Sequence, residues 1–233
     1  MSTGSANPNV SSQNTAAIRE LMHGYGAADE GSYYTAWLAA TASTAVATTT
    51  QALGTTSPSF VVYNPNPVGG YNIYLRSVKI RLTAVTTGVT TIEHVGVLAP
   101  NIANFTTVGT IFNGPTNVNS NSGTTSRALI YGGVNVCNAP TAIPGARIVH
   151  TGPVSAIIPI VLDQWQFTYG DIAGGGGWNA VIGTTGSSII ASLPPVVIAP
   201  QWYYTLGFWG ASWAASAATY RTDIAYIERP SGQ

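Results

Sequence analysis

Few residues of this 233-residue chain have the side-chain type and the spacing that catalysis or metal binding requires. Glu93 and His94 form the one adjacent pair of an acid and an imidazole. On a β-strand adjacent side chains point to opposite faces, so these two cannot share a proton or a metal ion. The other histidines, His23 and His150, lie far from this pair in sequence. The pattern favours a structural role for His94.

Motifs of hydrolases and nucleotide-binding proteins are absent from the sequence. The stretch 210–214 lacks the second glycine of the G-x-S-x-G nucleophile elbow. The glycine run 174–177 is not followed by the lysine of a phosphate-binding loop. Asp163, Asp171 and Asp223 are carboxylates that a glycoside hydrolase would need in pairs, but nothing in their spacing indicates a pair. We therefore predict a protein that is not an enzyme and has no cofactor or metal ion.

Aromatic residues gather near the C-terminal end, within twelve residues: Trp202, Tyr203, Tyr204, Phe208, Trp209 and Trp213. Strand alternation predicts that Trp202, Tyr204 and Phe208 face the core. We expect the other three to be exposed and to bind a partner, because aromatic rings supply large contact areas at low entropic cost. Sugar stacking is the alternative. This region lacks the charged or amide groups that usually accompany a sugar site, so we favour protein contact.

Charged side chains are unusually scarce. Only 16 of the 233 residues are Asp, Glu, Lys or Arg, which is 7%, against about 25% in an ordinary soluble domain. The stretches Gly31 to Leu75 and Ile172 to Tyr220 contain none. A formal net charge of zero removes the repulsion that keeps free proteins apart. We therefore expect a subunit of an assembly, a homo-oligomer with a trimer favoured, with contacts made mainly by uncharged side chains.

Nucleic acid and membrane are not among the expected partners. Eight basic residues against eight acidic ones provide no basic field for phosphate groups. The longest strongly apolar run, Val154 to Leu162, is broken by Pro159 and is too short to span a bilayer.

The single cysteine, Cys137, cannot form an intramolecular disulfide. We interpret it as a small buried side chain.

The composition and the turn signals predict an all-β protein. β-branched and aromatic residues alternate with turns rich in Gly, Pro and Asn. We predict a single jelly-roll-like β-sandwich over residues 31–233, since about ten strands suit two packed sheets. The expected strands are 59–63, 72–83, 91–98, 106–112, 127–131, 146–150, 154–162, 164–169, 195–198, 202–209 and 222–228. The segment Asn113 to Thr125 is expected to be a long polar loop.

The expected strand 72–83 changes phase in its middle. Ile73 and Leu75 follow one parity, whereas Val78 and the apolar residues after it follow the other. A one-residue shift in an alternating strand indicates a β-bulge, here at Arg76 and Ser77.

Residues 1–30 are predicted to form an N-terminal arm with one short helix, from Thr15 to His23. Its apolar stripe has helical spacing and consists of Ile18, Leu21, Met22 and Tyr25. A helix of this length is not stable alone in water, so the stripe must dock on a surface. That surface belongs either to the same domain or to a neighbour. We count these four residues, together with Tyr203, Trp209 and Trp213, as candidate partner-binding residues.

Two parts of the chain resemble structural proteins of tailed bacteriophages that are encoded near the capsid genes. The C-terminal part comprises 194–200, 202–209 and 223–229, and the opening part is 28–34. The resemblance implies a head decoration or cement protein of jelly-roll type. Such a protein is made in the host cytoplasm, binds the major capsid protein on the outer surface of the virion and stabilises the shell. One alternative is a receptor- or glycan-binding module of a head or tail fibre, with the 113–125 segment and the exposed aromatics as its site. A more distant alternative is the shell protein of a small virus.

Overall fold

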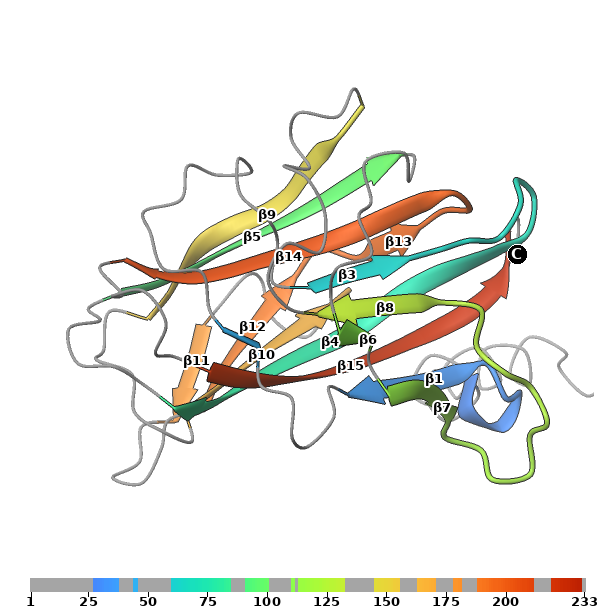
Figure 1. The fold of residues 1–233 in the computed structure, drawn as a ribbon, viewed down its shortest axis with the longest axis horizontal. Helices are drawn as coiled ribbons and strands as arrows, with labels where there is room; N and C mark the ends of the chain where they lie inside the picture. Colours follow the sequence, from blue (N-terminus) through green and yellow to red (C-terminus); the bar gives the residue numbers. More distant parts are fainter. Residues whose placement is uncertain are drawn as a thin grey trace, which may run out of the picture.

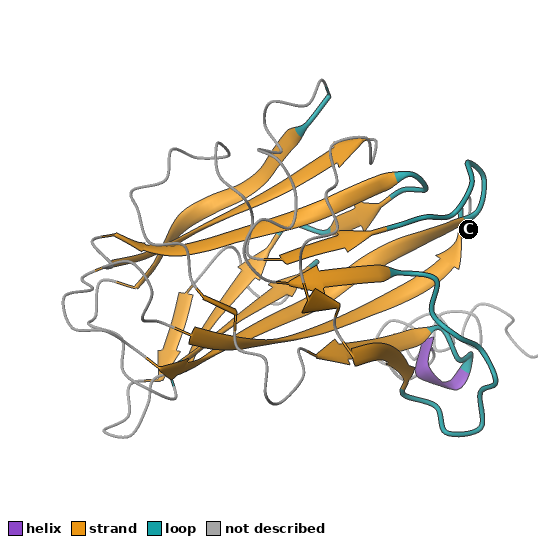
Figure 2. Ribbon diagram, in the orientation of Figure 1, coloured by secondary structure: helices purple, strands orange, loops and turns teal. Residues whose placement is uncertain are grey.

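The fold is described from a computed structural model of the chain. The residues that it describes are 27–37, 44–45, 60–84, 91–100, 110–111, 113–132, 145–155, 163–170, 178–181, 188–211 and 219–231. They form two β-sheets packed against each other (Figure 1). Among these residues the one helix is a single turn at 27–29, just before the first strand (Figure 2).

The strands follow one another along the chain and vary from two to fourteen residues in length. They are β1 (Tyr33–Trp37), β2 (Thr44–Ala45), β3 (Phe60–Tyr63), β4 (Tyr71–Ala84), β5 (Thr91–Pro100), β6 (Thr110–Ile111), β7 (Asn113–Asn117), β8 (Leu129–Gly132), β9 (Arg147–Ser155), β10 (Gln164–Tyr169), β11 (Trp178–Val181), β12 (Ser188–Leu193), β13 (Val196–Ile198), β14 (Trp202–Ala211) and β15 (Thr219–Pro230).

Eight strands form the centre of the sandwich. In the nine-stranded sheet β1, β15, β4 and β10 lie side by side in this order, and in the six-stranded sheet the order is β3, β14, β5 and β9. All neighbours among them are antiparallel. The chain changes sheet at every step between these strands except from β5 to β9, which is the connectivity of a jelly roll. The predicted jelly-roll-like β-sandwich is confirmed.

Five of the other strands widen the sheets at their edges, whereas β13 and β2 pair with end portions of the central strands β4 and β15. β7 pairs with β1 on one side of the larger sheet, while β12 and β11 extend it beyond β10 on the other side. β8 and β6 extend the smaller sheet beyond β3. β7 lies within the segment that was expected to be a loop, so that expectation is wrong for Asn113–Asn117. The pattern Asn-Gly-Pro-Thr-Asn has turn-forming residues, and pairing with β1 overrides this local preference.

The core lies between the sheets and consists of alternating side chains. In β10 the side chains of Trp165, Phe167 and Tyr169 are buried and the residues between them are partly exposed. From the other sheet Phe60 and Tyr204 belong to the same apolar cluster. Alternation along the strands therefore places these side chains in one large apolar cluster between the sheets, as the sequence predicts.

The predicted β-bulge is present in β4. Its pairing with β15 shifts register where Leu75 pairs with Tyr226 and Ser77 with Ala225, so Arg76 is the extra residue. Because of this extra residue, Leu75 before the bulge and Val78 after it are both buried in the core. The extra residue thus keeps the apolar side chains of β4 on the core face of the sheet both before and after the bulge.

Candidate functional site

A cavity lies at one end of the sandwich, where the beginning of β1 meets the end of β15. Its volume is about 540 Å³. It is bounded by the turn before β1, by the segment between β7 and β8, and by the start of β4. Its lining residues are Glu30, Gly31, Ser32, Tyr34, Tyr71, Gly123, Thr124, Thr125, Arg127, Glu228, Arg229 and Pro230.

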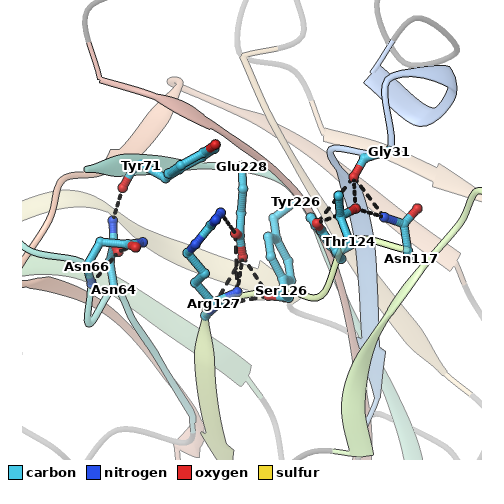
Figure 3. A network of polar contacts seen from close by, with 12 residues as sticks. Gly31, Asn64, Asn66, Tyr71, Asn117, Thr124, Ser126, Arg127, Tyr226 and Glu228 are labelled. Atoms are coloured by element: carbon cyan, nitrogen blue, oxygen red, sulfur yellow. Dashed lines mark hydrogen bonds and ion pairs between the residues drawn. The ribbon is translucent and has the colours of Figure 1, made fainter. Parts of the chain in front are cut away.

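Glu228 is the central polar group of this end of the sandwich (Figure 3). It lies on the core-facing side of β15 and is only 3% exposed. Its Oε1 accepts hydrogen bonds from Ser126 Oγ at 2.6 Å, from the Arg127 amide at 3.0 Å and from the Ala128 amide at 3.1 Å. A buried carboxylate needs such donors to offset the loss of water. Glu228 therefore ties the segment that leads into β8 to the last strand of the fold.

The hydrogen bonds continue from Ser126 to Tyr226. The two hydroxyl oxygens lie 2.6 Å apart. A serine has a single hydroxyl proton, and Ser126 donates it to Glu228, so Tyr226 donates to Ser126. Burial raises the pKa of Tyr226 well above its ordinary value, which keeps the phenol protonated as this donor. The order of donation is therefore Tyr226 to Ser126 to Glu228.

The carbonyl group of Gly31 organises the other side of the cavity. It accepts hydrogen bonds from Thr124 Oγ1 at 2.6 Å, from Asn117 Nδ2 at 2.8 Å and from the Tyr34 hydroxyl at 3.2 Å. Gly31 has a positive φ of 68°, and a Cβ at this position would overlap Ser122 Oγ. A glycine is required here, and it fixes the 117–124 segment against the start of β1.

The rim of the cavity carries two basic and two acidic groups. The Arg127 guanidinium lies 3.9 Å from the centre of the Tyr71 ring and 4.0 Å from the Glu228 carboxylate. Arg229 forms an ion pair with Glu30 at 3.0 Å. The four groups therefore form two pairs of opposite charge, and their formal sum is zero.

A second polar cluster lies inside the core and contains two histidines. His150 Nε2 hydrogen bonds to the Tyr204 hydroxyl at 2.8 Å, which lies 2.7 Å from the Tyr169 hydroxyl. The His94 ring centre is 5.1 Å from that of His150. Burial, with a smaller contribution from His94, lowers the pKa of His150 to about 3. At neutral pH His150, Tyr169 and Tyr204 are therefore uncharged, which suits a structural role.

Gly96 makes room for this core cluster. It pairs with His150 across β5 and β9, and a Cβ on Gly96 would overlap the imidazole Nε2. The expectation of a structural role for His94 agrees with its exposure of 1%. The sequence did not indicate that His94 and His150 meet, because β5 and β9 are paired only by the tertiary fold.

The outer face of the larger sheet is the third feature. Cross-strand partners share a face, and Arg81 pairs with Arg221 while Lys79 pairs with Asp223. Arg76 belongs to this face as well, since its charge acts on the outward-facing Tyr33. Four of the eight basic residues of the chain, namely Arg76, Lys79, Arg81 and Arg221, thus lie on one face. Asp223 is the one acidic residue on the described strands of that face.

A groove of about 250 Å³ crosses this outer face beside Trp37, which is 40% exposed. Its floor is formed by small residues, among them Thr35, Ser77 and Ala225. Trp37 pairs in register with Asp223. An exposed indole beside a shallow groove and a basic row resembles the anchor of a protein interface.

The candidate residues from the sequence have different outcomes. The expectation that Tyr203 is exposed is wrong. Alternation does place it on the face opposite to Tyr204, but Tyr203 is fully buried by Val61, Tyr63, Ala99 and Tyr131 on neighbouring strands. The predicted helix with Ile18, Leu21, Met22 and Tyr25 lies outside the described residues, as do Trp213 and the side chain of Trp209.

The candidate carboxylates are separated. Asp163 is buried, with an exposure of 4%, whereas Asp223 lies exposed on the outer face of the larger sheet. Asp171 and the glycine run 174–177 lie outside the described residues. Within the described residues no group of three or more His, Cys, Asp or Glu side chains is arranged to hold a metal ion.

Sequence reasoning missed the Glu228 site. One signal was available, because Ile224, Tyr226 and Glu228 share the buried parity of β15, and an acid at such a position needs buried donors. The donors themselves are about a hundred residues away, so nothing local indicated them.

Comparison of the chain with known proteins identifies no relative. No family model matches the chain, and no curated protein or solved structure is similar to it. In the described part of the chain, no helix has the length and apolar character needed to cross a membrane.

Proposed function

We propose that this protein is a non-enzymatic virion structural protein of a bacteriophage, a decoration subunit that binds the outside of the head and stabilises the shell. The observation that carries the proposal is the outer face of the nine-stranded sheet, where basic residues and Trp37 gather on an otherwise charge-poor chain. The resemblance of residues 28–34 and of the C-terminal segments to phage structural proteins supports it. A compact jelly roll is a suitable rigid body for this task.

The proposed partner is an acidic surface of the major capsid protein. Arg76, Lys79 and Arg81 follow one another along the outer face of β4, with Asp223 as the one acid beside them. Complementary charge would orient the subunit on the shell, and the indole of Trp37 would be the apolar anchor. The sequence led us to expect mainly uncharged contacts, whereas the gathered basic side chains favour a charge-assisted contact.

We propose in addition that the subunit is a homo-oligomer, with a trimer favoured. The charge-poor composition supports this, since neutral surfaces associate readily. Light scattering of the purified protein at micromolar concentration tests it, and a clean monomer would contradict it.

Shell attachment is tested with virion heads stripped of this protein and re-bound to purified wild type, Arg81→Glu or Arg147→Glu. Both arginines are exposed, but Arg147 lies on β9 of the smaller sheet. We expect Arg81→Glu to reduce the head-bound fraction at least tenfold in sedimentation, and Arg147→Glu to bind as wild type. Wild type should also dissociate as sodium chloride is raised to about 0.5 M, where the Debye length falls to a few ångströms. Equal binding of both variants would reject the outer face as the contact, and failure of wild type to bind would reject the function.

A further inference from the structure

We propose that the cavity beside Glu228 binds a neutral saccharide. Its volume of about 540 Å³ lies in the range of about 300–1,000 Å³ that is typical of small-ligand sites. Its lining combines hydroxyl groups, guanidinium groups and carboxylates with the rings of Tyr34 and Tyr71. This inference is independent of the proposed shell attachment, because the cavity lies at the end of the sandwich and the basic row lies on a sheet face.

The charges of the lining select against ionic ligands. An anion in the cavity meets the carboxylates of Glu30 and Glu228, and a cation meets the guanidinium groups of Arg127 and Arg229. Glu228 is also a poor cation ligand, since its Oε1 already accepts three hydrogen bonds. A neutral ligand avoids both repulsions and can use Arg127, Arg229 and Glu30 as hydrogen-bond partners, whereas the buried Glu228 carboxylate keeps its hydrogen bonds within the protein.

Hydroxyl groups on adjacent carbons suit the paired charges of the rim. Arg229 and Glu30 lie 3.0 Å apart, so a donor and an acceptor stand side by side. A sugar hydroxyl can accept from the guanidinium while its neighbour donates to the carboxylate. Hydrogen bonds to charged groups are roughly twice as strong as those between neutral groups. The Arg127 side chain, which is 48% exposed, offers further donors beside Thr125.

Contacts within the protein hold the lining residues in place, which favours binding. The Gly31 carbonyl holds Thr124 and Asn117 in place, and Glu228 holds the Arg127 backbone. Stacking on Tyr71 restricts the Arg127 guanidinium. A site that is already in its bound arrangement loses less entropy on binding. Weak sugar hydrogen bonds can then produce measurable affinity.

Saturation-transfer NMR on the full chain tests the proposal with four probes: maltotriose, chitotriose, 3′-sialyllactose and inorganic phosphate. Two matched pairs of variants accompany wild type. Arg127→Met removes a guanidinium from the cavity, and Arg147→Met removes the one that lies over Trp202 elsewhere. Gly123→Trp fills the cavity from a position where an added Cβ meets nothing within 4 Å, and Asn121→Trp places the same ring on the same segment outside the lining. Circular dichroism verifies that each variant is folded.

We expect at least one neutral trisaccharide to bind, with the dissociation constant raised tenfold or more by Arg127→Met and by Gly123→Trp and unchanged by the two controls. The proposal is overturned if neither neutral trisaccharide shows saturation transfer at millimolar concentrations, or if Gly123→Trp binds as tightly as wild type. Tighter binding of sialyllactose or phosphate would also overturn it, because an anionic ligand contradicts the charge argument. Head attachment of Arg127→Met should remain that of wild type, so the two proposals fail separately.

Discussion

The two polar clusters of this sandwich both contain buried polar side chains, but the hydrogen bonds of these side chains are satisfied in different ways. Glu228, at the end of the fold, is a buried acid that is surrounded by three donors from one segment and that borders an open cavity. His150 and Tyr204, in the middle of the core, are neutral groups that bond to one another and line neither of the two cavities described above.

The difference shows what each region can do. In the core, burial disfavours charge, and the low pKa of His150 is the consequence. At the end of the sandwich, backbone amides and Arg127 support a carboxylate beside solvent, so polar groups remain available to a ligand. The enclosed cluster stabilises the fold, whereas the open one can take part in recognition.

The largest expected effect is the loss of the Glu228 carboxylate. Glu228→Ala leaves the Ser126 hydroxyl and two amides without their acceptor, so we expect the free energy of unfolding to fall by about 3–5 kcal/mol. The control is Glu30→Ala, whose carboxylate is exposed and whose pair with Arg229 is worth about 0–1 kcal/mol. Urea denaturation measures both. Equal effects would contradict the central role of Glu228.

The next effect is a pH dependence that arises from the core. The folded-state pKa of His150, about 3, lies below its ordinary value of 6.5, so the unfolded state binds the proton more tightly. The contribution of neutral His150 to the free energy of unfolding is therefore fully present above pH 6.5. It is lost as the pH falls towards 3, by up to about 1.4 kcal/mol per pH unit. We expect wild type to lose about 3 kcal/mol more than His150→Gln between neutral pH and about pH 4. Identical pH profiles in urea denaturation would show that His150 is not buried as described.

A smaller effect is expected from Gly96→Ala. The added methyl group overlaps the imidazole of His150. The shift needed to remove this overlap should lower the free energy of unfolding by about 2 kcal/mol. Gly123→Ala places the same group in open space at the cavity and should change stability by less than about 0.5 kcal/mol. Thermal unfolding of the two variants compares an enclosed cluster with an open one directly.

The smallest effect compares one hydroxyl from each cluster. Tyr204→Phe removes the group that bonds to both His150 and Tyr169, and we expect a loss of about 1–2 kcal/mol. Tyr226→Phe should cost roughly 0.5–1 kcal/mol, because Ser126 keeps its bond to Glu228. If Tyr226→Phe is the more damaging variant in urea denaturation, the open cluster depends on that hydroxyl more than the contacts indicate.

The sequence by itself determined much of the secondary structure. The strand 164–169 was predicted with its observed bounds, and the bulge at Arg76 was predicted from a phase change alone. Both are local patterns, because side chains alternate with period two along any strand. β1, β11 and β12 were not predicted, since Ala, Ser, Thr and Gly around them weaken the alternation on which such predictions depend.

Only the tertiary structure decided which residues meet. It placed Ser126 beside Glu228 and His94 beside His150. It also buried Tyr203: alternation predicted on which face of the strand this residue lies, but not the residues that cover it. It also gathered Arg81 and Arg221 on one face. Alternation shows on which side of a strand a residue lies, but strand order decides what that side faces. In a jelly roll the neighbours of a strand come from distant parts of the chain, so local sequence carries no signal of them.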